Sequence, residues 1–292
     1  MISVKEAFET FKSRLELSET ESADAIRRHS DVRNCIKAAF DIKRDFLTGS
    51  YKRHTKTKPL KDIDIFFVLN SSEAGRRAKP PSQMIDAFEA CLVEKYGRDS
   101  VDRGRRCVTV EFEKRNPSVE GRILSIDAVP AFEDGENYEI PDDKLGKWIK
   151  SNPEVHAAEA TSKNKECDGA WIPLVKMIKR WNRSAGNPVK PSFLLEVMGQ
   201  SLVVAPFTDY PNEVRSFFAS ARVAVHHDFG DPAGLGPPVS DQMTSAMRTT
   251  ASEAFHQAEL QAMRAMQLER QGKAGEALSL WQDVMGTYFP TS

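Results

Sequence analysis

The chain has 292 residues, of which 40% are hydrophobic and 28% charged, so it can bury a sizeable core and lies near the size at which one core divides into lobes. Its 41 Lys and Arg residues balance 42 Asp and Glu residues, for a formal net charge of -1, which excludes the global basic field that drives tight binding to long nucleic acid. Its four cysteines lack a paired spacing, which argues against a structural zinc site and favours a reducing cytoplasm.

The first elements that we expect are two amphipathic helices. Val4, Phe8 and Phe11 recur at helical spacing near the start, and a second helix is predicted over residues 22–40. No signal peptide or membrane span is visible, because the first residues lack an apolar core and the longest apolar runs have the length of strands. We therefore expect a cytoplasmic protein with no membrane partner.

A Gly-Ser pair comes next, at Gly49 and Ser50. Glycine adopts backbone angles that are closed to other residues, and a turn that opens a short helical segment presents unpaired N–H groups to a phosphate. Ser50 adds a hydroxyl donor. The basic segment 51–61 that follows is able to face a polyphosphate, but a run of charge is more often a solvated loop, and we expect its lysines to face solvent.

Two carboxylates, Asp62 and Asp64, interrupt a strand predicted over residues 62–69. Strands disfavour Asp, and alternation turns both side chains the same way, with roughly 6 to 7 Å between their Cα atoms. One interpretation is that they solubilise the end of a strand. The other is a magnesium site, because Mg²⁺ prefers oxygen ligands and binds through one or two carboxylates together with substrate phosphates. The second interpretation predicts a nucleotide as co-ligand.

A third carboxylate is expected on a later strand. After a helix predicted over residues 82–96, two strands at 107–113 and 123–129 form a predicted hairpin through the turn-rich segment 116–121. Asp127 interrupts the second of these apolar strands. Glu111 and Glu113 compete for the same role, but they belong to the polar and apolar alternation that a half-exposed strand shows anyway. We therefore prefer Asp127.

Beyond residue 142 the predicted elements are mainly helical. A helix over residues 171–183 has one apolar face and, opposite it, a cationic stripe of Lys176, Lys179 or Arg180, and Arg183. Such a stripe is ordinarily solvated. The alternative is that it contacts phosphate.

The next predicted helix covers residues 190–198. Pro191 suits a first helical turn, and Ser192 lies at the positive end of the helix, which makes a second place to hold phosphate. A Pro- and Gly-rich loop is predicted over residues 230–240, and helical composition continues over residues 243–285.

Gly-Ser, a spacer, Asp-x-Asp and a later Asp together resemble the signature of the polymerase-β-like nucleotidyltransferases. By that resemblance, Gly49 and Ser50 would hold the donor triphosphate. Asp62, Asp64 and Asp127 would be the catalytic residues and would bind two Mg²⁺ ions, with Mn²⁺ as an alternative.

The fold that the resemblance implies is α+β, with a mixed sheet lobe, a helical lobe and an active-site cleft between them. We assign residues 1–142 to the N-terminal helices and the nucleotidyltransferase sheet lobe. Residues 143–292 form the helical C-terminal lobe.

The helix around Lys179 and the segment 191–196 resemble one branch in particular, the cGAS/DncV-like nucleotidyltransferases, or CD-NTases, of bacterial anti-phage CBASS systems. The resemblance is strongest over residues 46–69 and 152–196. It implies that Lys179 and Ser192 contact the triphosphate and that Ser151 lies near a bound base.

The resemblance implies synthesis of a cyclic di- or trinucleotide second messenger from NTPs, with release of pyrophosphate. In the family, a small hydroxyl residue at the position of Ser151 accompanies the use of purines, so the resemblance implies ATP or GTP as substrate. The alternative is an RNA-tailing or small-molecule nucleotidyltransferase that uses the same three Asp residues. We expect a monomer, an operon-encoded regulator, and a downstream effector that binds the product.

Overall fold

The computed structural model describes residues 2–112 and 125–292. By their contacts the residues fall into two compact units. We call Leu17–Ala157 the sheet unit, and Met1–Glu16 with Ala158–Ser292 the helical unit. These units differ from the predicted lobes, 1–142 and 143–292, in the N-terminal helix and in the segment 143–157.

One mixed sheet runs through the sheet unit. Its strand order is β1-β2-β5-β4-β3, while β6 pairs with the C-terminal end of β5 and β7 pairs with β6. The pair β2 and β5 is parallel, and the other pairs are antiparallel. The predicted mixed sheet is thus confirmed. The strands are β1 (Ile42–Leu47), β2 (Asp62–Leu69), β3 (Val101–Arg103), β4 (Val108–Glu111), β5 (Ser125–Asp134), β6 (Asn137–Asp142) and β7 (Lys147–Ser151).

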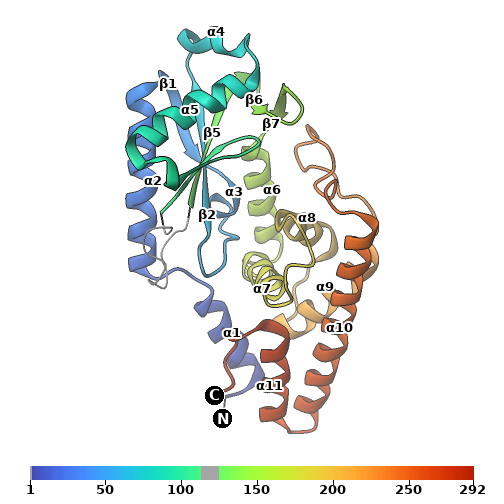
Figure 1. The fold of residues 1–292 in the computed structure, drawn as a ribbon. Helices are drawn as coiled ribbons and strands as arrows, with labels where there is room; N and C mark the ends of the chain where they lie inside the picture. The colour runs from blue at the N-terminus through green and yellow to red at the C-terminus, as the bar shows by residue number, and fades with distance from the viewer. Residues whose placement is uncertain (1, 113–124) are drawn as a thin grey trace. The chain divides into compact units, whose positions relative to one another are not determined.

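Two long helices, α2 (Glu19–Ala39) and α5 (Pro81–Tyr96), pack on one face of this sheet (Figure 1). Their apolar side chains share a core with Ile63, Ile65 and Phe67 of β2. Because side chains alternate along a strand, Asp62 and Asp64 point to the opposite face. The shorter helices of the unit are α3 (Gly49–Lys52), α4 (Ala74–Arg77) and the 3-10 turns η1 (Ser71–Glu73) and η2 (Arg98–Ser100).

The two strands of the predicted hairpin, β4 and β5, do pair antiparallel. The residues between them, 113–124, lie outside the described residues. Glu113 and the predicted turn at 116–121 therefore receive no structural account.

A strand that the sequence did not predict follows residue 142. β7 pairs antiparallel with β6, although we expected mainly helix in this region. Only Trp148 and Ile149 are apolar in its five residues, so the strand depends on pairing with β6, which a short sequence pattern does not reveal.

The helical unit is built around a large aromatic core. Trp171, Trp181 and Trp281 are buried in it, and the Trp181 ring stacks on Phe255 with ring centroids 4.8 Å apart. α6 (Pro153–Glu166) begins in the sheet unit and continues into the helical unit. The remaining helices of the unit are α1 (Val4–Arg14), α7 (Trp171–Ser184), α8 (Phe193–Leu202), α9 (Tyr210–Ala224), α10 (Ser245–Arg270) and α11 (Ala274–Met285). Within the described ranges, none of the helices is both long enough and apolar enough to cross a membrane.

Candidate functional site

The registers of three strands set polar side chains in two rows on the face of the sheet opposite α2 and α5. In the parallel pair, Asp64 lies beside Asp127, and Asp62 lies beside Ser125. The antiparallel strand β4 extends both rows by one residue each. The first row is Asp64, Asp127 and Thr109, and the second row is Asp62, Ser125 and Glu111.

Asp127 occupies the middle of the first row. The pKa of its carboxyl group is raised to about 6, mainly by burial and in addition by the negative charges of Asp62 and Glu111. A hydrogen bond works in the opposite direction, because the Thr109 hydroxyl donates to Oδ1 of Asp127 over 2.6 Å. Negative charge is therefore concentrated around a carboxylate that is poorly solvated, which is an environment that a bound cation would stabilise.

The donor set of these rows fits a hard divalent cation. Carboxylate oxygens are the ligands that Mg²⁺ prefers, and Asp62, Asp64 and Asp127 supply them from adjacent strands of a rigid sheet. In their present rotamers, however, no three His, Cys, Asp or Glu side chains among residues 2–112 and 125–292 lie close enough together to hold a metal ion. The charge and the donor chemistry thus fit the ion, while its coordination shell is not formed by the side chains alone.

The Gly-Ser pair lies directly against this site. The Thr48 N–H donates to the backbone carbonyl of Asp64 over 2.8 Å, and this bond fixes the start of α3 beside β2. Gly49 has φ +60°, and a Cβ atom added there would lie 1.8 Å from Oδ2 of Asp64. Glycine is required on both counts, the backbone angle and the close approach.

Ser50 stabilises the turn that follows α3. Its carbonyl accepts hydrogen bonds from the N–H groups of Thr55, over 3.0 Å, and Lys56, over 3.1 Å. The start of the basic segment thereby folds back onto the Gly-Ser turn. The structure thus brings Gly49 and Ser50 together with Asp64.

Ser151 also belongs to the sheet unit. It is the last residue of β7 and pairs with Tyr138 of β6. The next residue, Asn152, precedes α6 and caps its first turn, because its side-chain oxygen accepts from the Val155 N–H over 3.2 Å. Ser151 is therefore held at a junction between strand and helix.

The two lysines of the predicted stripe on α7 are not solvated, so that interpretation is wrong for them. Lys176 is 3% exposed and Lys179 is 5% exposed. Lys176 Nζ lies 2.5 Å from Oε1 of Glu16, and Lys179 Nζ lies 3.0 Å from Oε1 of Glu196 in α8. A buried lysine requires a carboxylate partner, and the sequence pattern could not show the burial because both partners are remote in sequence.

Ser192 is the N-cap residue of α8. The helix begins at Phe193, so Pro191 precedes the first turn instead of lying in it. The Ser192 side chain is exposed and makes no capping hydrogen bond. Its hydroxyl lies at the positive end of this ten-residue helix. The Lys179–Glu196 ion pair joins α8 to α7.

Thr109 was given no role by the sequence analysis. The signal was present, because the alternation that buries Val108 and Val110 turns Thr109 and Glu111 to the polar face. Only the register with β5 shows that Thr109 meets Asp127, while Glu111 meets Ser125.

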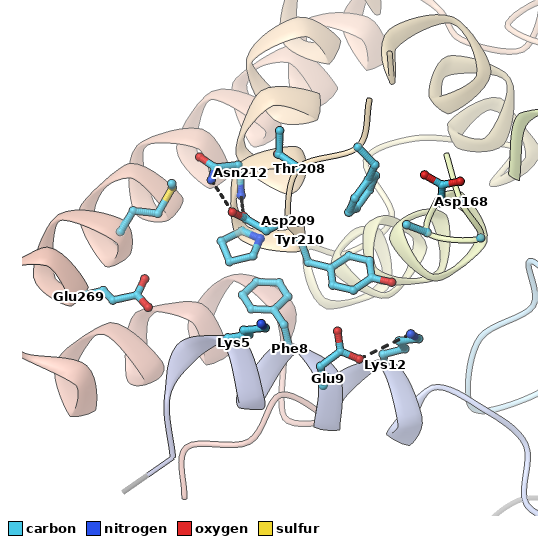
Figure 2. A pocket seen from close by; sticks show the side chains of 15 residues that line it. Lys5, Phe8, Glu9, Lys12, Asp168, Thr208, Asp209, Tyr210, Asn212 and Glu269 are labelled. Carbon is cyan, nitrogen blue, oxygen red and sulfur yellow. Dashed lines mark hydrogen bonds and ion pairs between the residues drawn. The ribbon is translucent and has the colours of Figure 1, made fainter. Parts of the chain in front are cut away.

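A cavity of about 460 Å³ lies elsewhere, inside the helical unit. Figure 2 shows it between α1, the start of α9 and the end of α10. Its walls include a Glu9–Lys12 ion pair of 3.5 Å and the ring of Tyr210. None of the predicted site residues lines this cavity.

Comparison with known families gives one match that spans more than half of the chain. The model of the SMODS domain, the Second Messenger Oligonucleotide or Dinucleotide Synthetase domain, matches residues 2–164. A cyclic AMP-AMP-AMP synthase from Acinetobacter is 28% identical over 100% of this chain and 87% of its own length. A probable cyclic nucleotide synthase from Bacillus cereus is 25% identical over 83% of this chain and 81% of its own length.

Solved structures of CD-NTases have the same fold as this chain. The structure of E. coli MS115-1 CdnC with ATP has a TM-score of 0.71 and 16% identity, and the alignment covers 99% of both chains. The CD-NTase CdnG of Bradyrhizobium diazoefficiens, in complex with GTP, has a TM-score of 0.73 and 15% identity over 96% of this chain and 94% of its own. The predicted polymerase-β-like fold and the predicted family are both confirmed. The chain belongs to the CD-NTases, the cGAS/DncV-like nucleotidyltransferases with a second messenger oligonucleotide or dinucleotide synthetase domain.

Proposed function

We propose that this protein makes a cyclic di- or trinucleotide from purine NTPs. A 3′- or 2′-hydroxyl of one nucleotide attacks the α-phosphate of the next, pyrophosphate leaves, and a final attack closes the ring. The observation that carries the proposal is the row in which Asp64 and Asp127 lie side by side on parallel strands, with Gly49 packed against Asp64.

Asp62, Asp64 and Asp127 would hold two Mg²⁺ ions, or Mn²⁺ in their place. Bound there, the ions would lower the pKa of the attacking hydroxyl and stabilise the charge of the leaving pyrophosphate. The pKa of Asp127, raised by burial and by neighbouring carboxylates, supports this assignment, because a cation would offset both effects.

The donor triphosphate would lie against the Gly-Ser turn. The absence of a side chain at Gly49 lets α3 begin directly against Asp64, and Ser50 adds a hydroxyl donor. From the helical unit, we assign Ser192 and Lys179 as further contacts to the triphosphate. The exposed N-cap position of Ser192 supports the first assignment. The second rests on the family resemblance, and the ion pair with Glu196 would hold the lysine in place.

ATP is the substrate that the relatives favour. The Acinetobacter relative, which aligns over all of this chain, is named a cyclic AMP-AMP-AMP synthase. Others are named a cyclic UMP-AMP synthase, from Rhodothermus marinus, and a cyclic GMP-AMP synthase, from Staphylococcus schleiferi. Adenosine is common to the three names. We therefore assign ATP as one substrate, with GTP next, and Ser151 as a neighbour of the base.

For a role in anti-phage signalling, we assign an operon-encoded regulator and a downstream effector that binds the product as partners. A neighbouring E. coli CdnC structure is a complex with a HORMA protein, which supports a regulator of that kind here. The cysteines Cys35, Cys91, Cys107 and Cys167 are free thiols, as expected for work in the cytoplasm.

The test is to incubate the purified protein with Mg²⁺ and the four NTPs, one of them labelled at the α-phosphate, and then to digest with phosphatase. A cyclic product keeps its label, because it has no terminal phosphate. Omitting one NTP at a time identifies the bases, and we expect that ATP cannot be omitted. Label that enters only an added RNA would instead show the tailing alternative.

A further inference from the structure

Thr109 contacts Asp127 from β4, the third strand of the polar face. Its hydroxyl donates to Oδ1 over 2.6 Å, which is the usual length for a hydrogen bond from a hydroxyl to a carboxylate. The antiparallel register of β4 and β5 sets the two residues directly opposite each other. A threonine side chain has restricted χ1 freedom in a strand, so the donor is held in place.

The contact leaves the charge of Asp127 intact. A hydroxyl group fixes the carboxylate without neutralising it, whereas a lysine or arginine at position 109 would compete with a bound cation. The bond occupies Oδ1 on the side of β4. On the other side, Asp64 of β2 is the row neighbour of Asp127, so the side chain that would share an ion with Asp127 comes from the strand on the side away from Thr109.

We propose that Thr109 is a positioning residue that orients the Asp127 carboxylate for a divalent cation. This inference rests on the proposed function, because it assigns Thr109 to the same metal site. Hydrogen-bond partners of metal-binding carboxylates typically affect metal affinity or activity by about 10- to 100-fold. We therefore expect about a tenfold loss of metal affinity when the hydroxyl alone is removed.

The experiment compares Thr109→Val, which keeps the shape and loses the donor, with Thr109→Ser, which keeps the donor. Mn²⁺ is titrated into each purified variant and followed by electron paramagnetic resonance, and Tm is measured without metal. We expect Thr109→Val to bind Mn²⁺ about tenfold more weakly. We expect Thr109→Ser to remain within about twofold of the wild type. The Mg²⁺ concentration for half-maximal activity should shift in parallel.

The outcomes separate this inference from the function on which it rests. Equal Mn²⁺ affinity of Thr109→Val and wild type, with product still made, overturns the role of Thr109 alone. Absence of both Mn²⁺ binding and product in the wild type overturns both proposals. If Thr109→Ser loses as much affinity as Thr109→Val, packing of the methyl group is responsible and the positioning role is wrong.

Discussion

The polar face of the sheet and the buried face of α7 handle charge in opposite ways. On α7 each of the two buried lysines meets a carboxylate, Lys176 with Glu16 and Lys179 with Glu196. On the sheet, carboxylates face other carboxylates, and their mutual repulsion adds to burial in raising the pKa of Asp127.

The difference separates charge that serves the fold from charge that is kept for a ligand. A buried ion needs a partner of opposite sign, and α7 supplies one within the protein. Carboxylates that repel one another have raised pKa values, and a bound cation would offset this repulsion. Groups with perturbed pKa values concentrate at functional sites. Mutations in the two regions should therefore affect different properties. Those on the polar face of the sheet should affect activity, and those on α7 should affect stability.

The largest effect is expected on the sheet. Asp62→Asn combined with Asp64→Asn should reduce product formation to below about a thousandth of the wild-type rate, a loss of roughly 4 kcal/mol in transition-state stabilisation. Because like charges are removed, the Tm should not fall. Product yield and thermal unfolding are measured on the same preparation, and retained activity would show that the metal site lies elsewhere.

On α7 the expected effect is on folding. Lys179→Met should lower the free energy of unfolding by about 3 kcal/mol, because Glu196 stays buried without its lysine. Adding Glu196→Gln should restore most of that loss. In the restored double variant the KM for ATP should still be raised, if Lys179 also contacts the triphosphate. Urea unfolding gives the stability of each variant.

The control for this pair is the exposed contact between Lys12 and Glu9, with side chains 40% and 54% exposed. Lys12→Met should cost less than about 1 kcal/mol. Equal stability of Lys179→Met and the double variant would contradict the comparison drawn above.

Gly49 tests how tightly the sheet site is packed. Gly49→Ala sets a Cβ on Asp64 Oδ2, and displacement of that carboxylate should lower kcat by about 100-fold. Gly146→Ala is a matched control, because Gly146 has φ +62° but no atom within 4 Å of the added Cβ. It should lose about 1 kcal/mol of stability and keep its activity. Similar kcat values for the two variants would show that Asp64 moves without consequence.

The smallest effect is expected from substitution of Ser192. Since its side chain makes no capping bond, Ser192→Ala should change stability by less than about 0.5 kcal/mol and raise the KM for ATP about fivefold. Thr244 is the converse case, because its side chain caps α10 through the Met247 N–H over 3.3 Å. Thr244→Ala should cost about 1 kcal/mol and leave KM unchanged. A KM for Ser192→Ala equal to that of the wild type would show that Ser192 does not contact the triphosphate.

Local patterns in the sequence were sufficient for some features of the sheet site. The alternation around Asp62 and Asp64 predicts a strand with both acids on one face, and β2 has that form. Asp127 breaks an apolar strand, and β5 is that strand. The Gly-Ser turn follows from glycine's backbone freedom, and Gly49 has the positive φ that this requires.

Features that depend on pairing between distant segments were not predictable. The parallel register that sets Asp64 beside Asp127 joins residues 63 positions apart in the sequence numbering, and the Thr109 contact needs the register of β4 as well. The partner of Lys176 comes from the residues after α1, and the partner of Lys179 comes from α8. The pattern along one helix showed the cationic stripe, but it could not show that its two lysines are buried and paired with carboxylates.

The central claim is that the carboxylate rows serve the synthesis of a ring. Mass spectrometry of the product made from ATP and Mg²⁺ tests it most directly, with the Asp62→Asn and Asp64→Asn double variant as the blank. A product one water lighter than the linear chain of nucleotide monophosphates, present with wild type and absent with the blank, is the predicted result. A linear product that ends in a 5′-triphosphate, or the same product from the double variant, would contradict the account.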